Sequence, residues 1–186
     1  MSSPRTGRGR VPAREMTVAD VLGLLDRFAS AGVRVWIDGG WGVDALVGRR
    51  RRAHDDLDVV VSIDDVPRVQ DVLRRAGYTF RDRDAPLSFM TVDADGRQVD
   101  VHPVTFDEHG NGIYQMDDGD AWTYPAGGLA GAGSIGGRPV RCLTAELQRR
   151  VHAGYELRAK DHEEIRILHE RFGVSPPPGY EWPEAR

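Results

Sequence analysis

The sequence predicts an α/β fold of the α+β kind, in which a mixed β-sheet is flanked by helices and followed by a C-terminal helical portion. Short apolar runs typical of buried strands alternate with segments of helical periodicity. The turn Asp93-Ala94-Asp95-Gly96 lies between two strand-like runs and predicts a hairpin, which adds antiparallel pairing to the sheet. Two helical segments, residues 144–157 and 161–172, come near the end of the chain.

The first element is a helix that begins after Thr17. Thr17 is a suitable N-cap, and Asp20 stands three residues later. Apolar residues then recur at helical spacing as far as Phe28, and Gly32 is expected to end the helix. A short buried strand over residues 33–37 follows.

A glycine pair and a basic run separate the next elements. Asp38-Gly39-Gly40 predicts a tight break before a brief helix over residues 41–47, which Gly48 stops. The arginine run at 49–52 leads into a second strand over residues 56–62. The chain therefore places a strand, a turn, a helix and a second strand in direct succession.

The middle of the chain contains a further helix and the hairpin. The helix opens near Asp64 and closes at Gly77, and the hairpin strands cover residues 87–92 and 97–104. Residues 107–137 are rich in glycine and lack periodicity, which predicts an irregular segment. Loops longer than about 12–15 residues are often lids or binding surfaces, so we expect ligand recognition partly there.

Composition and charge exclude several classes of function. A length of 186 residues suits one domain, and a net charge of -4 gives no broad electrostatic footprint for nucleic acid. No apolar run approaches the ~18 residues that a membrane span needs, and no signal-peptide core is visible. The single cysteine, Cys142, cannot form an internal disulfide. We therefore expect a cytoplasmic protein without nucleic-acid or membrane partners; the oligomeric state is left open.

Two aspartates at the start of the second strand are the strongest chemical signal. Alternate side chains of a strand share a face, so Asp56 and Asp58 project together, roughly 6–7 Å apart at the backbone. Two carboxylates on one face repel each other unless a cation lies between them. Magnesium prefers oxygen ligands and usually binds substrate phosphates as well. The alternative is a solvated acidic strand edge.

Two neighbouring features strengthen the metal hypothesis. The Gly39-Gly40 pair lies between a strand and a helix start, where the backbone can approach a phosphate closely. On the second hairpin strand, Asp100 and His102 share one face, which adds a third carboxylate. Three carboxylates beside a phosphate-binding turn suit a two-metal, in-line displacement.

The motifs in this order resemble the nucleotidyltransferase superfamily that includes DNA polymerase beta. The stretch WIDGGWGVDALVGRRRRAHDDLDVVV is similar to the antibiotic nucleotidyltransferases. Two later stretches, VDVHPVTFDEHGNGIY and IGGRPVRCLTAELQRRVHAGYEL, are most similar to the lincosamide nucleotidyltransferases. The aminoglycoside 2''-adenylyltransferases share the first stretch and the GRPVRC element. The resemblance covers residues 17–174 and implies the nucleotidyltransferase fold.

The chain is expected to divide into four parts. Residues 1–15 are rich in Arg, Gly, Ser and Pro and lack periodicity, which predicts a disordered leader, and residues 16–140 are expected to be the nucleotidyltransferase catalytic domain. C-terminal helices are expected over residues 141–175, followed by a Pro-rich tail over residues 176–186.

The resemblance assigns the catalytic roles. Asp56 and Asp58 would bind two magnesium ions, and Asp100 would be the third metal ligand and the base that accepts the hydroxyl proton. ATP or another nucleoside triphosphate would be the co-substrate, with its phosphates over Gly39 and Gly40.

Several further residues match family positions but also have ordinary structural alternatives. Asp44, Arg52, His54 and Lys160 would lie beside the nucleotide; the alternatives are salt bridges, a hydrogen-bonding histidine and a solvated lysine. His102 would line the acceptor pocket.

The acceptor is the most open part of the hypothesis. The resemblance implies transfer of AMP from ATP to a hydroxyl of a small-molecule antibiotic, a lincosamide first, whose sugar Tyr114 could contact. The alternatives are an aminoglycoside or other hydroxyl acceptor, and a non-catalytic nucleotide-binding module. Acidic residues in the glycine-rich segment suit a polycationic aminoglycoside; they are Asp107, Glu108, Asp117, Asp118 and Asp120.

Overall fold

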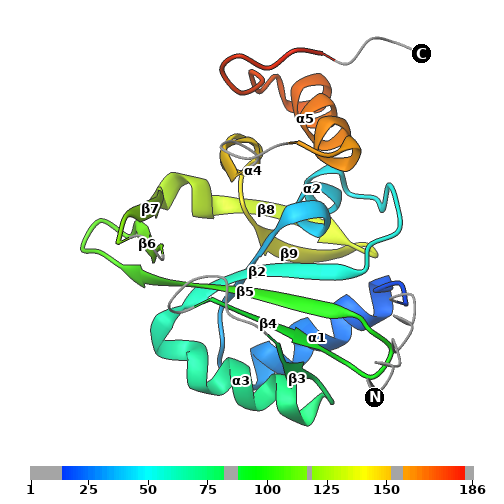
Figure 1. Ribbon diagram of the computed structural model, residues 1–186, viewed down its shortest axis with the longest axis vertical. Helices are drawn as coiled ribbons and strands as arrows, with labels where there is room; N and C mark the ends of the chain where they lie inside the picture. Colours follow the sequence, from blue (N-terminus) through cyan, green and yellow to red (C-terminus); the bar gives the residue numbers. More distant parts are fainter. Residues whose placement is uncertain (1–13, 82–87, 117–118, 152–156, 183–186) are drawn as a thin grey trace, which may run out of the picture.

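The protein is described by a computed structural model over residues 14–81, 88–116, 119–151 and 157–182. In these segments one mixed sheet is flanked by helices, with α1 and α3 on one side and α2, α4 and α5 on the other (Figure 1). The strands are β1 (Val35–Asp38), β2 (Asp56–Ser62), β3 (Thr79–Phe80), β4 (Phe89–Val92), β5 (Gln98–Phe106), β6 (Gly112–Gln115), β7 (Ala121–Tyr124), β8 (Gly131–Ile135) and β9 (Arg138–Cys142). The helices are α1 (Val18–Ser30), α2 (Gly39–Val47), α3 (Val66–Arg75), α4 (Ala145–Val151) and α5 (Ala159–Phe172), with short 3-10 turns η1 (Ile63–Asp65) and η2 (Ala126–Ala130). The predicted fold class is confirmed.

The strand order places the chemically important strands at the centre of the sheet. The order is β3-β4-β5-β2-β1-β9-β8, and the β6–β7 hairpin continues from the end of β5. β2 runs parallel to β5 and antiparallel to β1, and β1 runs parallel to β9. The sheet is therefore mixed, and its three central strands come from segments far apart in sequence.

The alternation along β2 divides the core into two layers. Leu57, Val59 and Val61 are fully buried in a large cluster with residues of α1 and α3. Val60 points to the other face, where it packs in a smaller cluster with Trp36 and with residues of η2 and α4. Asp56 and Asp58 share that second face, so they lie at the edge of the smaller cluster and not in the main core.

The N-terminal cap forms as predicted. The Thr17 hydroxyl accepts a hydrogen bond from the Asp20 backbone at 3.2 Å, and the Asp20 carboxylate accepts one from the Thr17 backbone at 2.9 Å. Met16 is fully buried and its backbone N–H donates to His54 at 2.6 Å. Residues 1–13 of the expected leader lie outside the described residues, and Arg14 forms an ion pair with Asp95.

The prediction of an irregular segment over residues 107–137 is wrong for the described part. This stretch forms β6, β7, η2 and β8, and its glycines make turns between them. Gly110 and Gly136, for example, adopt positive φ angles of 79° and 57°. Strands of four or five residues are too short to show a clear alternation, which explains why sequence periodicity did not reveal them.

Smaller differences concern element ends. Helix α2 begins at Gly39, two residues earlier than predicted, because the Asp38 side chain caps it by accepting from the Gly39 N–H at 2.6 Å. Helix α5 begins at Ala159, where Asp161 accepts a hydrogen bond from the Arg158 backbone at 2.8 Å. The predicted helix 144–157 includes residues 152–156, which lie outside the described residues.

The Pro-rich tail folds back on α5 as far as it is described. Gly173, at φ 69°, ends the helix and turns the chain. The Tyr180 hydroxyl lies 2.9 Å from Nδ1 of His162, and the Trp182 ring lies 5.4 Å from that of His169. These contacts cover the outer face of the helix.

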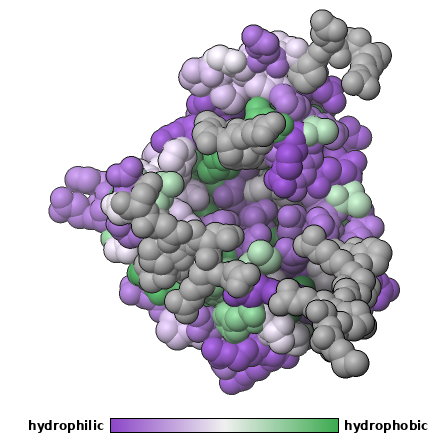
Figure 2. Space-filling view, in the orientation of Figure 1, coloured by the Kyte–Doolittle hydropathy of each residue, from purple (hydrophilic) through white to green (hydrophobic). Residues whose placement is uncertain are grey.

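The visible surface is mainly hydrophilic (Figure 2). Its exposed large apolar residues within the described segments are Phe80, Phe106, Met116, Phe172 and Trp182. Among the described helices, none is long and apolar enough to cross a bilayer.

Candidate active site

Strand register brings three carboxylates into one row. Asp58 of β2 is the direct partner of Asp100 on β5 and of Asp38 on β1. Asp56 lies two residues before Asp58 on the same face. All four line a cavity of about 570 Å³. The structure therefore brings together the three carboxylates that the sequence selected and adds Asp38.

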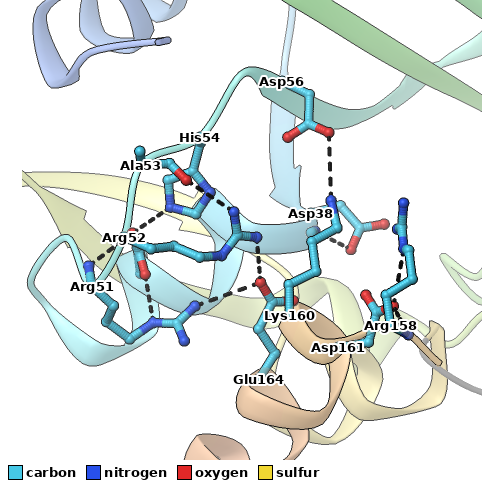
Figure 3. Close-up of polar contacts among 12 residues, drawn as sticks. Asp38, Arg51, Arg52, Ala53, His54, Asp56, Arg158, Lys160, Asp161 and Glu164 are labelled. Carbon is cyan, nitrogen blue, oxygen red and sulfur yellow. Dashed lines mark hydrogen bonds and ion pairs between the residues drawn. The ribbon is translucent and has the colours of Figure 1, made fainter.

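Repulsion between carboxylates is visible in the electrostatics of Asp56. Burial and the negative charge of Asp58 raise the pKa of Asp56 above its ordinary value, although Lys160 opposes the shift. The Lys160 ammonium lies 3.9 Å from the Asp56 carboxylate, across the cavity from β2 (Figure 3). Lys160 and Arg52 lower the pKa of Asp56 but do not cancel the effects of burial and of Asp58.

His102 lies on the same face of β5 as Asp100. Its Nε2 is 3.8 Å from a carboxylate oxygen of Asp58. Burial works against the charged imidazolium, but the interactions with Asp58, Asp38 and Asp100 outweigh it and raise the pKa of His102. Its ring meets Tyr114 edge-on at 6.0 Å. Both residues that the sequence assigned to the acceptor therefore line the cavity.

The glycine pair packs too closely against its neighbours to carry side chains. Gly39 has a φ of 60°, and a Cβ there would overlap the Asp58 carboxylate. A Cβ on Gly40 would lie 2.5 Å from Nη2 of Arg52 and 2.6 Å from Nδ1 of His54. The missing side chains leave backbone exposed to the cavity at the start of α2, where N–H groups and the helix dipole favour an anion.

Asp44 and His54 lie behind the cavity, not on its lining. Asp44 is fully buried and accepts from Arg51 at 2.5 Å and lies 2.7 Å from Nε2 of His54. The His54 ring packs on Trp41, with centroids 4.8 Å apart. This arrangement holds the loop before β2 in place, and direct nucleotide contact by Asp44 or His54 stays a prediction.

Arg52 does line the cavity, and α5 fixes its position. Its Nη2 donates to the Glu164 carboxylate at 2.6 Å, and Arg51 lies 3.7 Å from the same oxygen (Figure 3). Glu164 is only 2% exposed, so this ion pair is shielded from solvent. The helix that carries Lys160 is thereby tied to the loop that precedes the metal-binding candidates.

The sequence reasoning did not assign several residues that line the cavity. The sequence showed Asp38 only as part of a predicted turn. Its strand pairing with Asp58 places it in one row with Asp58 and Asp100. Arg150 of α4 and Arg158 at the start of α5 also line the cavity. Their spacing along the chain gave no indication of a functional role. Trp122 and Tyr124, which the sequence offered beside Tyr114 as aromatic faces for a sugar, also line the cavity. The unassigned lining residues include Gln98, Met116, Arg150, Arg158, Asp161 and Glu164.

The chemistry of the donor set fits a magnesium site. Asp56, Asp58 and Asp100 offer carboxylate oxygens, the ligands that magnesium prefers, and burial together with the charge of Asp58 raises the pKa of Asp56, an effect that a bound cation would oppose. In the described segments, no three Asp, Glu, His or Cys side chains are already arranged around a single metal position. A metal at these carboxylates is therefore taken up below as a proposal.

Comparison with known proteins agrees with this geometry. The family model of the aminoglycoside-2''-adenylyltransferases matches residues 20–168. A lincosamide resistance protein of Staphylococcus haemolyticus is 27% identical over 153 residues, which cover 82% of this chain and 94% of that protein. A 2''-aminoglycoside nucleotidyltransferase of Escherichia coli is 28% identical over 112 residues, or 60% of this chain and 59% of that protein.

A solved structure extends the similarity to three dimensions. The lincomycin-bound crystal structure of the lincosamide antibiotic adenylyltransferase LnuA superposes with a TM-score of 0.75 and 26% identity, covering 83% of this chain and 98% of that chain. The fold, the site and these matches define a nucleotidyltransferase. The chain belongs to the aminoglycoside-2''-adenylyltransferase family, as the sequence motifs indicated.

Proposed function

We propose that the protein transfers AMP from ATP to a hydroxyl group of a lincosamide antibiotic and releases pyrophosphate. The observation that carries the proposal is that the carboxylates of Asp56, Asp58 and Asp100 lie beside the Gly39-Gly40 turn in one cavity. This arrangement can hold a triphosphate and a hydroxyl group at the same place.

The nucleotide would bind at the end of the cavity formed by α2 and α5. The backbone at Gly39 and Gly40 lines the cavity at the start of α2, where the helix dipole favours the phosphates, and Lys160 and Arg52 supply positive charge. The ion pair between Arg52 and Glu164 keeps the guanidinium in this position before the nucleotide arrives. Because the Arg52 side chain is already held in place, less conformational entropy is lost when the nucleotide binds.

Asp56, Asp58 and Asp100 would hold two magnesium ions together with the triphosphate. When bound, these ions would neutralise phosphate charge and lower the pKa of the acceptor hydroxyl.

The protein's own groups account for the rest of the reaction. Asp100 accepts the proton of the acceptor hydroxyl, and that oxygen forms a new bond to the α-phosphorus. The bond between the α-phosphorus and the bridging oxygen breaks, and pyrophosphate leaves beside Lys160. Because no covalent bond to the protein forms, positioning and charge stabilisation supply the acceleration.

The other end of the cavity suits a sugar with an apolar appendage. Tyr114 and Trp122 of the β6–β7 hairpin line it together with Tyr124. Burial and the negative charge of Asp38 raise the pKa of Tyr124 well above its ordinary value, so its hydroxyl remains neutral. Aromatic faces and a neutral hydroxyl can pack against a sugar ring and bond to its hydroxyl groups.

An aminoglycoside is the second candidate acceptor, because the matching family is named for aminoglycosides and the Escherichia coli relative is a 2''-aminoglycoside nucleotidyltransferase. The acidic residues that would have favoured it do not support it. Asp107 accepts hydrogen bonds within its own turn from Asn111 and His109, and neither it nor Glu108 nor Asp120 lines the cavity. Asp117 and Asp118 lie outside the described residues.

A direct assay tests the proposed reaction. The protein is incubated with ATP and magnesium in the presence of lincomycin, clindamycin or tobramycin, and each antibiotic is analysed by mass spectrometry while pyrophosphate is measured. We expect one added AMP on lincomycin and clindamycin, dependent on magnesium. Addition to tobramycin without addition to the lincosamides would overturn the acceptor assignment. Absence of pyrophosphate release with every acceptor would favour a non-catalytic nucleotide-binding module.

The glycine turn offers a separate test of the nucleotide end. We expect Gly40→Ala to weaken binding of ATP with magnesium by about tenfold or more, because the new Cβ would displace the side chains of Arg52 and His54. Isothermal titration calorimetry measures the change. Gly23→Ala on α1 is the matched control, since nothing lies within 4 Å of its Cβ position. Unchanged ATP affinity in Gly40→Ala would show that the phosphates do not approach this turn.

A further inference from the structure

One arginine of the cavity belongs to the aromatic end and has no part in the proposed chemistry. Arg150 lies near the end of α4, and its guanidinium carbon is 5.1 Å from the ring centroid of Trp122 on β7. Trp122 in turn meets Tyr124 edge-on at 6.4 Å. A cation is therefore fixed on the aromatic wall.

Arg150 comes from a different helix than the basic groups at the nucleotide end. Figure 1 shows α4 on the side of α5 that faces the β6–β7 hairpin. Lys160 and Arg158 come from the α5 side of the cavity, close to Asp56 and Asp161. Arg150 contacts Trp122, which lies beside Tyr124, where the acceptor would bind.

We propose that Arg150 determines acceptor specificity by disfavouring polycationic acceptors. The proposal rests on the proposed function, because it concerns the acceptor end of the same site. A fixed positive charge repels an acceptor in proportion to the acceptor's own charge. An aminoglycoside with several ammonium groups is therefore penalised more strongly than a lincosamide with a single amine.

The negative charge inside the cavity makes a group that opposes polycation binding necessary. The carboxylates of Asp38, Asp58 and Asp100 attract any cationic acceptor, and they attract a polycation most. Discrimination must then come from groups outside the carboxylate row. Arg150 can supply it because contact with the Trp122 face restrains its planar guanidinium near the acceptor.

Removal of the charge gives the direct test. In Arg150→Gln, we expect the dissociation constant for tobramycin, measured by isothermal titration calorimetry, to fall at least tenfold. The constant for lincomycin should change less than threefold. Arg150→Lys keeps the charge and should keep most of the discrimination. Arg149→Gln is the matched control, because Arg149 is the neighbouring arginine, forms an ion pair with Glu146 at 2.8 Å and does not line the cavity.

Each outcome decides the proposal. Equal changes for both antibiotics, no gain for tobramycin, or a wild-type protein that binds tobramycin as tightly as lincomycin would overturn it. If circular dichroism shows that Arg150→Gln is unfolded, Arg150→Met retains an apolar stem on Trp122 and is judged by the same criteria. Because the readout is binding, failure of AMP transfer to every acceptor contradicts the proposed function alone, while a tobramycin gain would still support the role of Arg150.

Discussion

Asp56→Asn and Asp58→Asn are each expected to abolish AMP transfer, with turnover falling by about 100-fold or more. Each substitution removes one of two carboxylates that share a face of β2 and would hold the metal ions and triphosphate. Turnover measured by pyrophosphate release tests this. Retention of more than about a tenth of wild-type turnover, a loss below ~1.4 kcal/mol in the barrier, would contradict the two-metal assignment.

The same variants should leave the fold intact. The pKa of Asp56 is raised, so its ionised form costs stability in the folded state without ligand. Asp58→Asn removes the neighbouring charge and should preserve or increase the free energy of unfolding at pH 7. That gain in the free energy of unfolding should shrink as the pH falls toward ~4. Asp56 then becomes protonated in the wild type, and the repulsion between Asp56 and Asp58 is lost without a substitution. Urea unfolding at both pH values measures the difference.

A matched control separates the metal role from a general charge effect. Asp55 is the exposed neighbour of Asp56 and does not line the cavity. Asp55→Asn makes the same charge change one residue away, and we expect transfer to stay within about twofold of wild type. A large loss in Asp55→Asn would show that total negative charge, not the two positions on β2, matters.

The sequence predicted those parts of the fold that local patterns determine. The bounds of β2 were predicted at Asp56 and Ser62 because two alternating aspartates lead into a continuous apolar run that ends at Ser62. The N-terminus of α1 was predicted because Thr17 and Asp20 form a local hydrogen-bond pair. The β6–β7 hairpin was missed because its strands, which pair Tyr114 with Trp122, have only four residues each and lie in a stretch rich in glycine and aspartate.

The candidate site shows the same division between local and distant information. The spacing of Asp56 and Asp58 is a local feature, and a strand face follows from it. Their alignment with Asp38 and Asp100 depends on the order β5-β2-β1, which the sequence alone did not fix. Glu164 is more distant still, since its ion pair with Arg52 joins residues 112 positions apart.

The C-terminal helices are part of the site's construction because of these distant contacts. Glu164 of α5 binds Arg52, and Lys160 of the same helix lies near Asp56. The loop before β2 is held in turn by the buried contacts of Asp44 with Arg51 and His54. Displacement of α5 would therefore move Lys160 away from Asp56 and release Arg52, the two cations that lower the pKa of Asp56.

Asp100→Asn is expected to separate nucleotide binding from transfer. Asp100 lies on β5, opposite Asp58, whereas Asp56, Lys160 and the glycine turn would provide the proposed triphosphate contacts. Replacing its carboxylate removes the group proposed to accept the hydroxyl proton. We expect turnover to fall by about 10²–10⁴-fold, the range for loss of a general base. Binding of ATP with magnesium, measured by calorimetry, should change less than about threefold.

The control for Asp100→Asn lies on the same hairpin. Asp95 is exposed at the turn and pairs with Arg14 and Arg97 at 3.4 Å, so Asp95→Asn makes the same charge change with little expected effect on either measurement. A pH–rate profile adds a second readout: residual transfer in Asp100→Asn should increase with hydroxide concentration, because solvent must then remove the proton. If ATP binding is lost together with turnover, Asp100 is a nucleotide or structural ligand and the assignment as base is wrong.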